Sequence, residues 1–199
     1  MKKYFILFVL SLFSYKELLA NHTRGGWMYY EYLGPGNAPN TNRYHITLKF
    51  YTSCVLEQGQ FDPTINFSLF DAVSRQLITE IAVTYTTSDN IQNCSSQQCH
   101  PCISNIPIIC YKITTYETTQ DLPAIPGGYI VSYQRCCRIA GIVNLANPSN
   151  NVGESWTVTI PGTAIPGADH NSSARFSQND TAIICQNNYF TFDFNYGTC

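Results

Sequence analysis

Residues 44–51 alternate apolar and polar side chains without a break. Successive side chains of a β-strand point to opposite faces, so this pattern predicts a strand with one buried face, made of Tyr44, Ile46, Leu48 and Phe50. The alternation returns at 65–70, 155–160 and 190–194, and further extended segments are predicted at 27–33, 77–85, 108–118, 129–137 and 181–185. From residue 21 onward no helical spacing of apolar residues holds for three turns. The pattern predicts an all-β fold.

Glycine, proline and asparagine separate these segments, so we expect about eight or nine short strands. Parallel strands would need crossover helices, and the sheets should therefore be mainly antiparallel. Two such sheets packed face to face form a β-sandwich, with Trp156 and the phenylalanines in its core. We expect an immunoglobulin-like antiparallel β-sandwich that is stapled by disulfides.

The chain begins with the basic segment Met1–Lys3 and an apolar run over residues 4–13, and a small residue follows at Ala20. This order is typical of a secretory signal peptide, so we expect cleavage near Ala20 and a mature chain that starts at Asn21. The run is too short for a membrane span, and no later stretch approaches the ~20 apolar residues that a span needs. We therefore expect a secreted protein, extracellular or on the outer cell surface, without a membrane span in the mature chain.

The charge of the chain argues against a nucleic-acid partner. The full chain carries −2, and loss of three lysines and one glutamate with the leader would take it to −4. Without clustered lysine and arginine there is no basic surface for phosphates. Charged residues make up 12% of the chain, about half the usual ~25%, so neutral polar side chains must cover most of the surface, as suits an exported β protein.

All nine cysteines follow the leader, and an oxidising compartment makes disulfides their expected state. The candidates are Cys54, Cys94, Cys99, Cys102, Cys110, Cys136, Cys137, Cys185 and Cys199. Nine is odd, so one thiol is unpaired or bonds outside this chain, and the connectivity stays open. Alternation along the strand expected at 127–138 would point Cys136 and Cys137 to opposite faces, so each should bond a different neighbour. A reactive pair of adjacent thiols is the functional alternative.

The motif Cys99-His100-Pro101-Cys102 suggests redox or metal chemistry. A CxxC pair can exchange electrons, but that mechanism needs a helix N-terminus in a βαβ setting, and this pair lies in a polar loop. Zinc held by Cys94, Cys99, His100 and Cys102 is a second alternative. A disulfide-stapled loop is the third. Carboxylates and serines show no spacing typical of an acid/base pair, a nucleophile elbow or a calcium loop, so we expect no enzymatic activity, no catalytic residue, no metal and no cofactor.

Four aromatic residues lie close together in the first expected strand: Trp27, Tyr29, Tyr30 and Tyr32. On alternating faces some of them must point outward, where flat rings can stack on sugars or on a partner protein. The alternative is that they cover the edge of the sandwich or pack against a following domain.

Several segments occur in an order that resembles a known family: Asn21–Gly26 before an aromatic strand, Tyr44–Cys54, Ile125–Tyr129, Tyr133–Arg138, Asn144–Pro148 and Ile184–Asn187. The resemblance is to the amino-terminal module of large Bacteroidetes surface proteins, often labelled as carrying a gliding-motility-associated C-terminal domain and PKD or cadherin-like repeats. It implies export to the periplasm, type IX secretion across the outer membrane by the envelope machinery, and display or release as an adhesin-like protein. No catalytic residues come with it.

From these observations we expect a signal peptide at 1–20, a β-sandwich domain at 21–165, and closing strands or the truncated start of a following immunoglobulin- or cadherin-like domain at 166–199. The relatives usually run on to a C-terminal sorting domain, so we expect either a fragment of a longer protein or a stand-alone relative. The first functional hypothesis is a non-enzymatic structural or adhesion module, kept folded by its disulfides. The second is a carbohydrate-binding module that uses the aromatics, with surface glycans or envelope proteins as partners. The third is a thiol-disulfide oxidoreductase.

Overall fold

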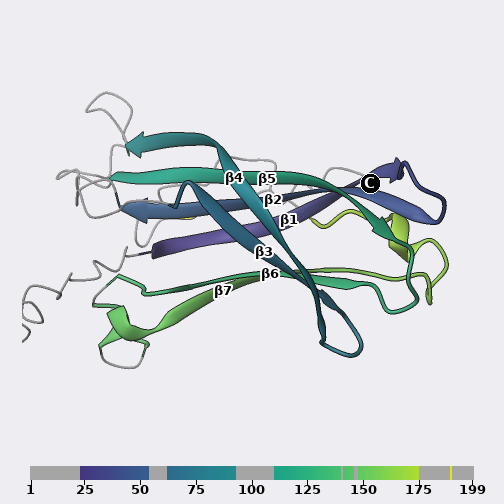
Figure 1. The fold of residues 1–199 in the computed structure, drawn as a ribbon. Coiled ribbons are helices and arrows are strands. Elements are labelled where there is room, and N and C mark those ends of the chain that lie inside the picture. The colour runs from purple at the N-terminus through teal and green to yellow at the C-terminus, as the bar shows by residue number, and fades with distance from the viewer. Residues whose placement is uncertain are drawn as a thin grey trace, which may run out of the picture.

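Seven β-strands, each paired antiparallel with its neighbours, make up the sheet of this protein (Figure 1). The structure is a computed structural model and describes residues 23–53, 62–92, 110–139, 141–145, 148–174 and 189. The strands are β1 (Thr23–Pro35), β2 (Thr41–Ser53), β3 (Thr64–Asp71), β4 (Leu77–Gln92), β5 (Cys110–Pro123), β6 (Tyr129–Cys136) and β7 (Gly153–Ile160). Two short 3-10 helices, η1 (Ser149–Asn151) and η2 (Ala168–His170), follow β6 and β7. An all-β antiparallel fold is confirmed.

The strands hydrogen-bond in one continuous order, β1-β2-β5-β4-β3-β6-β7. Strand β4 joins the two halves, because its first part, up to Thr84, pairs with β3 and its second part, from Tyr85, pairs with β5. The register shifts between Tyr85 and Thr87 at this change of partner, and a bulge of this kind bends a strand. Figure 1 shows β4 crossing from β3 to β5. The result is one sheet folded over itself into a nearly closed barrel; the finer prediction of an immunoglobulin-like sandwich stays a prediction.

The core fills the inside of this barrel. The four alternating residues that the sequence predicts to be buried, Tyr44, Ile46, Leu48 and Phe50, are all inside, with exposed fractions of 0–2%. Trp156 is also buried, as predicted, and its ring stacks on Tyr133 with centroids 5.8 Å apart. Phe50 meets the edge of Trp156, with centroids 5.2 Å apart. Aromatic pairs therefore join β2, β6 and β7 across the interior.

Strand β4 is longer than the sequence predicts. The expected strand ends at residue 85, with a polar loop after it, but β4 continues to Gln92 along the edge of β5. Residues 86, 87, 89 and 90 are exposed, so backbone pairing rather than a buried face maintains this part of the strand. Period-two alternation is absent there for that reason. The strands predicted at 181–185 and 190–194 lie outside the described residues.

The two end strands of the sheet, β1 and β7, approach each other and nearly close the barrel. The Thr23 hydroxyl donates to Glu154 Oε2 at 2.7 Å. Thr23 also bridges the segment after β6, because its amide donates to the Cys137 carbonyl at 3.1 Å and its carbonyl accepts from the Ile139 amide at 3.2 Å. The start of β1 is thereby fixed between β7 and the segment after β6, both more than a hundred positions away.

Further along, the chain after η2 covers the same edge of β1. The amides of Tyr30 and Tyr32 donate to the hydroxyls of Ser173 and Ser172 at 2.8 and 3.0 Å. The Ser173 amide returns a bond to the Tyr30 carbonyl at 3.0 Å. An uncovered strand edge is a template for pairing with another chain. Residues 171–174 thus protect the edge that the β1–β7 approach leaves open.

The structure places a bond between the sulfurs of the adjacent residues Cys136 and Cys137, and the prediction that each cysteine bonds a different neighbour is not confirmed. Strand β6 ends at Cys136, so the alternation assumed for Cys137 does not extend to it. A bond between adjacent residues connects no two strands and is not the staple that the sequence predicts. Six other candidates, Cys54, Cys94, Cys99, Cys102, Cys185 and Cys199, lie outside the described residues, and the side chain of Cys110 is likewise not described. Inter-strand disulfides stay a prediction.

Candidate functional site

The four aromatics of β1 divide between the two faces of the strand. Trp27 and Tyr29 lie on the outer face and stack on each other, with ring centroids 4.5 Å apart and planes 25° apart. The Lys49 ammonium lies 5.2 Å from the Trp27 ring, a cation–π contact. Tyr30 is buried, and Tyr32 packs against the core. The structure therefore brings only Trp27 and Tyr29 together as an outward-facing pair, and part of each ring is already covered by the other.

The outer face of β2 and β5 carries a polar network beside this pair. His45 Nδ1 lies 3.1 Å from Thr119 Oγ1, and His45 Nε2 lies 3.9 Å from Glu117 Oε1. The Thr86 hydroxyl on β4 donates to Glu117 Oε2 at 3.2 Å. These contacts join neighbouring strands, and cross-strand pairs of this kind stabilise a sheet. His45 lies on the outer face, as the sequence predicts.

Ion pairs tie the ends of strands together. Arg43 forms a two-pronged contact with Asp121, from Nε to Oδ1 at 2.7 Å and from Nη2 to Oδ2 at 2.9 Å. The Asn37 amide donates to the same carboxylate at 2.9 Å. The hydrogen bond from Arg43 is the main cause that lowers the pKa of Asp121 to about 2. This carboxylate therefore fastens the β1–β2 turn to the end of β5, and its chemistry is structural.

A buried carboxylate, Asp169, lies where η2 docks on the barrel. Asn42 Nδ2 donates to Asp169 Oδ2 at 2.8 Å, and the Tyr44 hydroxyl donates to the Asp169 carbonyl. His170 Nε2 lies 3.5 Å from the same carboxylate, and the His170 ring stacks on Tyr32 with centroids 4.9 Å apart. Sequence reasoning missed this cluster, because more than a hundred residues separate its two halves and no local pattern marks them.

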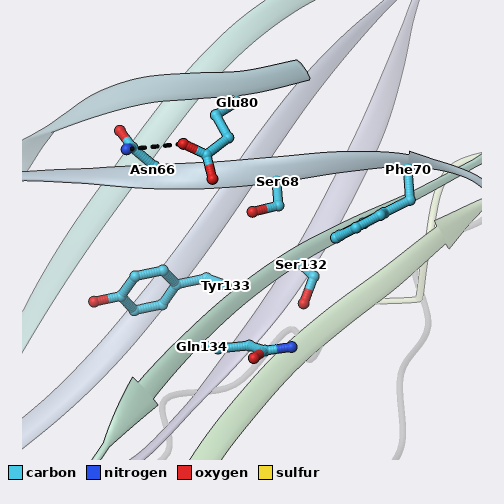
Figure 2. Close-up of a pocket in the computed structure, with 7 residues that line it drawn as sticks. All are labelled: Asn66, Ser68, Phe70, Glu80, Ser132, Tyr133 and Gln134. Carbon is cyan, nitrogen blue, oxygen red and sulfur yellow. Dashed lines mark hydrogen bonds between the residues drawn. The ribbon is translucent and has the colours of Figure 1, made fainter. Parts of the chain in front are cut away.

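A pocket of about 320 Å³ opens on the outer face of β4, β3 and β6. Figure 2 shows small hydroxyl side chains at its centre and larger side chains around them. Its lining is Asn66, Ser68, Phe70, Glu80, Ser132, Tyr133 and Gln134. None of these residues is predicted from the sequence to belong to a site. The alternation of β3 and β6 predicts which side chains face outward, but only the pairing of the strands places Ser68 opposite Ser132.

The predicted redox and zinc alternatives at Cys94, Cys99, His100 and Cys102 lie outside the described residues. Within the described ranges, no group of three or more His, Cys, Asp or Glu side chains could hold a metal ion. No helix in that same part of the chain is long and apolar enough to cross a membrane.

Comparison of this chain with models of protein families, with curated proteins and with solved structures finds no match.

Proposed function

We propose that this chain is a non-enzymatic structural or adhesion module of an exported bacterial surface protein. One observation carries the proposal: the edge strand β1 is covered at its start and again near its middle by segments distant in sequence. Thr23 is held by Cys137, Ile139 and Glu154, and Tyr30 is held by Ser173. A domain displayed outside the cell meets other copies without cytoplasmic chaperones, and a covered edge keeps those copies from pairing.

Two features of the sequence support the exported part of the proposal. The leader over residues 1–20 has the order of a secretory signal peptide. The segments Ile125–Tyr129 and Tyr133–Arg138 resemble the amino-terminal module of gliding-motility-associated surface proteins, which would take the chain through type IX secretion. In this proposal the two halves of the sheet, joined by β4, act as the layers of an immunoglobulin-like sandwich, and cysteines outside Cys136 and Cys137 supply the staples.

The test is to insert an epitope into the exposed β3–β4 turn at Val73, in the chromosomal copy of the gene, and to treat intact cells with protease. Val73 is 77% exposed, so the insertion should leave the barrel folded. We expect a chain without its leader on the cell surface or in the medium, with the epitope removed and the barrel intact. A variant that lacks residues 1–20 should stay inside the cell. A chain that keeps its leader and remains in the cytoplasm would contradict the proposal.

Mass spectrometry of the same exported material tests the disulfides. We expect linked peptides that join cysteines distant in sequence. Mostly reduced thiols would contradict the proposed disulfides but not the proposed export.

Carbohydrate binding by the β1 aromatics is the second candidate. It is favoured by the outward position of the stacked Trp27–Tyr29 pair. If this pair is a platform for sugars, Trp27→Ala should abolish binding on a glycan array, whereas Leu33→Ala, an exposed position on the same strand, should not. A wild-type chain that binds no glycan through this face would exclude it.

A further inference from the structure

The pocket on the outer face of β4, β3 and β6 follows from a run of small side chains in register. Ser68 on β3 lies opposite Glu80 on β4 and opposite Ser132 on β6. Asn66 and Phe70 lie two positions to either side of Ser68 and share its face, since side chains alternate along a strand. Two serines side by side leave a hollow between these longer neighbours, and Figure 2 shows that arrangement.

The floor of this hollow contains a polar atom that the fold does not use. Ser132 is 4% exposed, and its hydroxyl has no hydrogen-bond partner among the described residues. A buried hydroxyl without a partner is destabilising and calls for a ligand or water. Gln134 lines the pocket beside it and is exposed. A ligand that enters the pocket beside Gln134 would reach the Ser132 hydroxyl.

The chemistry of the walls limits the ligand. Asn66 Nδ2 donates to Glu80 Oε2 across a long distance of 3.4 Å, which leaves the second carboxylate oxygen and the amide oxygen for other donors. Gln134 adds an amide with both a donor and an acceptor. Among the described residues, the lining includes no lysine or arginine, so none of these side chains would balance a phosphate or a carboxylate.

Phe70 supplies an apolar wall. It is half-buried, and in Figure 2 its ring reaches toward the two serines. The pocket thus offers hydroxyls, amides, a carboxylate and an aromatic ring. These groups match a compact molecule with many hydroxyls and one apolar face. A hexose has that character, and a pocket of about 320 Å³ is at the small end of ligand sites.

We propose that this pocket binds one neutral hexose unit, either as a monosaccharide or as the terminal unit of a glycan. The Asn66 and Gln134 amides and the Glu80 carboxylate contact sugar hydroxyls. Phe70 packs on the apolar face of the ring, and the Ser132 hydroxyl gains its missing partner. The site lies on a different part of the sheet from Trp27 and Tyr29, and the argument for it does not depend on export.

Titration of the isotope-labelled mature chain with methyl glucoside, galactoside, mannoside and N-acetylglucosaminide, followed by amide NMR, tests the site. For a ligand of this size we expect a dissociation constant on the order of 1 mM. Shifts should concentrate on Asn66, Ser68, Ser132 and Gln134. Ser132→Val, which fills the floor, should weaken binding by about tenfold or more. Thr157→Val is the matched control, because Thr157 lies opposite Ser132 on β7 and outside the pocket lining, and it should leave the affinity unchanged.

Three further measurements complete the test. Ser68→Val fills the pocket from β3 instead of β6. It should abolish the same chemical-shift changes, and its melting temperature checks that the variant is folded. Glu80→Gln keeps a hydrogen-bonding group, so a neutral sugar should still bind it, whereas a preference for methylammonium that disappears in this variant would overturn the proposal in favour of a cation site. Oligosaccharides ending in the preferred hexose distinguish a glycan from a monosaccharide by their tighter binding. Absence of shifts at these amides with all four glycosides would overturn the proposal.

Discussion

The indole of Trp156 on β7 lies directly over Gly26 on β1. A Cβ atom at Gly26 would come within 2.7 Å of Trp156 Nε1 and within 2.7 Å of the Lys49 carbonyl oxygen. A glycine at this position lets the end strands of the sheet approach closely enough for one aromatic ring to bridge them. The near-closure of the barrel thus depends on a missing side chain in one strand and a large one in the other.

Gly26→Ala should therefore lower the free energy of unfolding by about 1–3 kcal/mol, as overpacking of a tight contact does. One of the two clashing atoms belongs to the backbone of β2, so a change of rotamer alone cannot relieve the strain. Urea unfolding measures the change. Gly153→Ala is the control, because its nearest atom, the Arg135 carbonyl oxygen, is 3.3 Å away, and it should cost clearly less. Equal stability of the two variants would contradict the close β1–β7 approach.

Buried tyrosines donate hydrogen bonds to the segment before β3 and to the end of β5. The Tyr116 hydroxyl donates to the Asp62 carbonyl and the Tyr129 hydroxyl to the Pro123 carbonyl, each at 2.6 Å. Tyr116→Phe and Tyr129→Phe should each lower the free energy of unfolding by about 1–2 kcal/mol, because each leaves a carbonyl without its donor. Tyr29→Phe, on the outer face, should change it by less than about 0.5 kcal/mol. Chemical denaturation of the three variants is the measurement. Equal losses of stability in all three would contradict the stabilising role of the Tyr116 and Tyr129 hydrogen bonds.

Four buried tyrosines lead us to expect that the protein unfolds at alkaline pH. Burial raises the pKa of Tyr44 to about 12, and burial likewise raises the pKa of Tyr116, Tyr129 and Tyr133. The folded-state pKa of these phenols lies above their unfolded value of about 10. Their contribution to the free energy of unfolding is therefore complete below pH 10 and is lost as the pH rises towards 12. Stability should therefore fall over that window. Ultraviolet titration should show several phenols ionising only as the chain unfolds; a single ionisation near pH 10, with the chain still folded, would be inconsistent with a buried set.

At acid pH the sign is reversed for Asp121. Its pKa is lowered to about 2 by Arg43, so the salt bridge contributes fully above the unfolded pKa of about 4 and is lost as the pH falls towards 2. Asp121→Asn should destabilise the protein at neutral pH, and the difference from wild type should disappear near pH 2. Denaturant unfolding of both proteins across this range is the measurement. A difference that stays constant with pH would show that the carboxylate charge has no part in stability.

The parts of the fold that could be predicted from sequence are those with one buried face. The period of two at Tyr44–Phe50 predicts the core side of β2 correctly, because burial selects the residues directly. The second part of β4 was missed, since exposed side chains leave no such pattern. The adjacent cysteines were placed by extending the alternation past the end of β6.

The candidate sites depend on pairing between distant segments, which no local pattern reveals. Ser68 and Ser132 look like ordinary outward serines until β3 and β6 pair and set them side by side. The split of the β1 aromatics could be predicted from alternation, but the stacking of Trp27 on Tyr29 could not. Asp169 and Asn42 likewise meet only once the chain after β7 folds back onto the start of β2.

The most direct test of the covered edge is hydrogen exchange of the β1 amides in the folded mature chain. The amides of Thr23, Tyr30 and Tyr32 donate to Cys137, Ser173 and Ser172, so all three should exchange slowly. Met28 lies two residues before Tyr30, so its amide faces the same edge of β1. Among the described residues, no backbone group outside the strands accepts a hydrogen bond from this amide. It should therefore exchange faster than the amides of Thr23, Tyr30 and Tyr32. Slow exchange at Thr23, Tyr30 and Tyr32 with faster exchange at Met28 is the predicted result; rapid exchange at all four would show that the edge is open and would contradict the account.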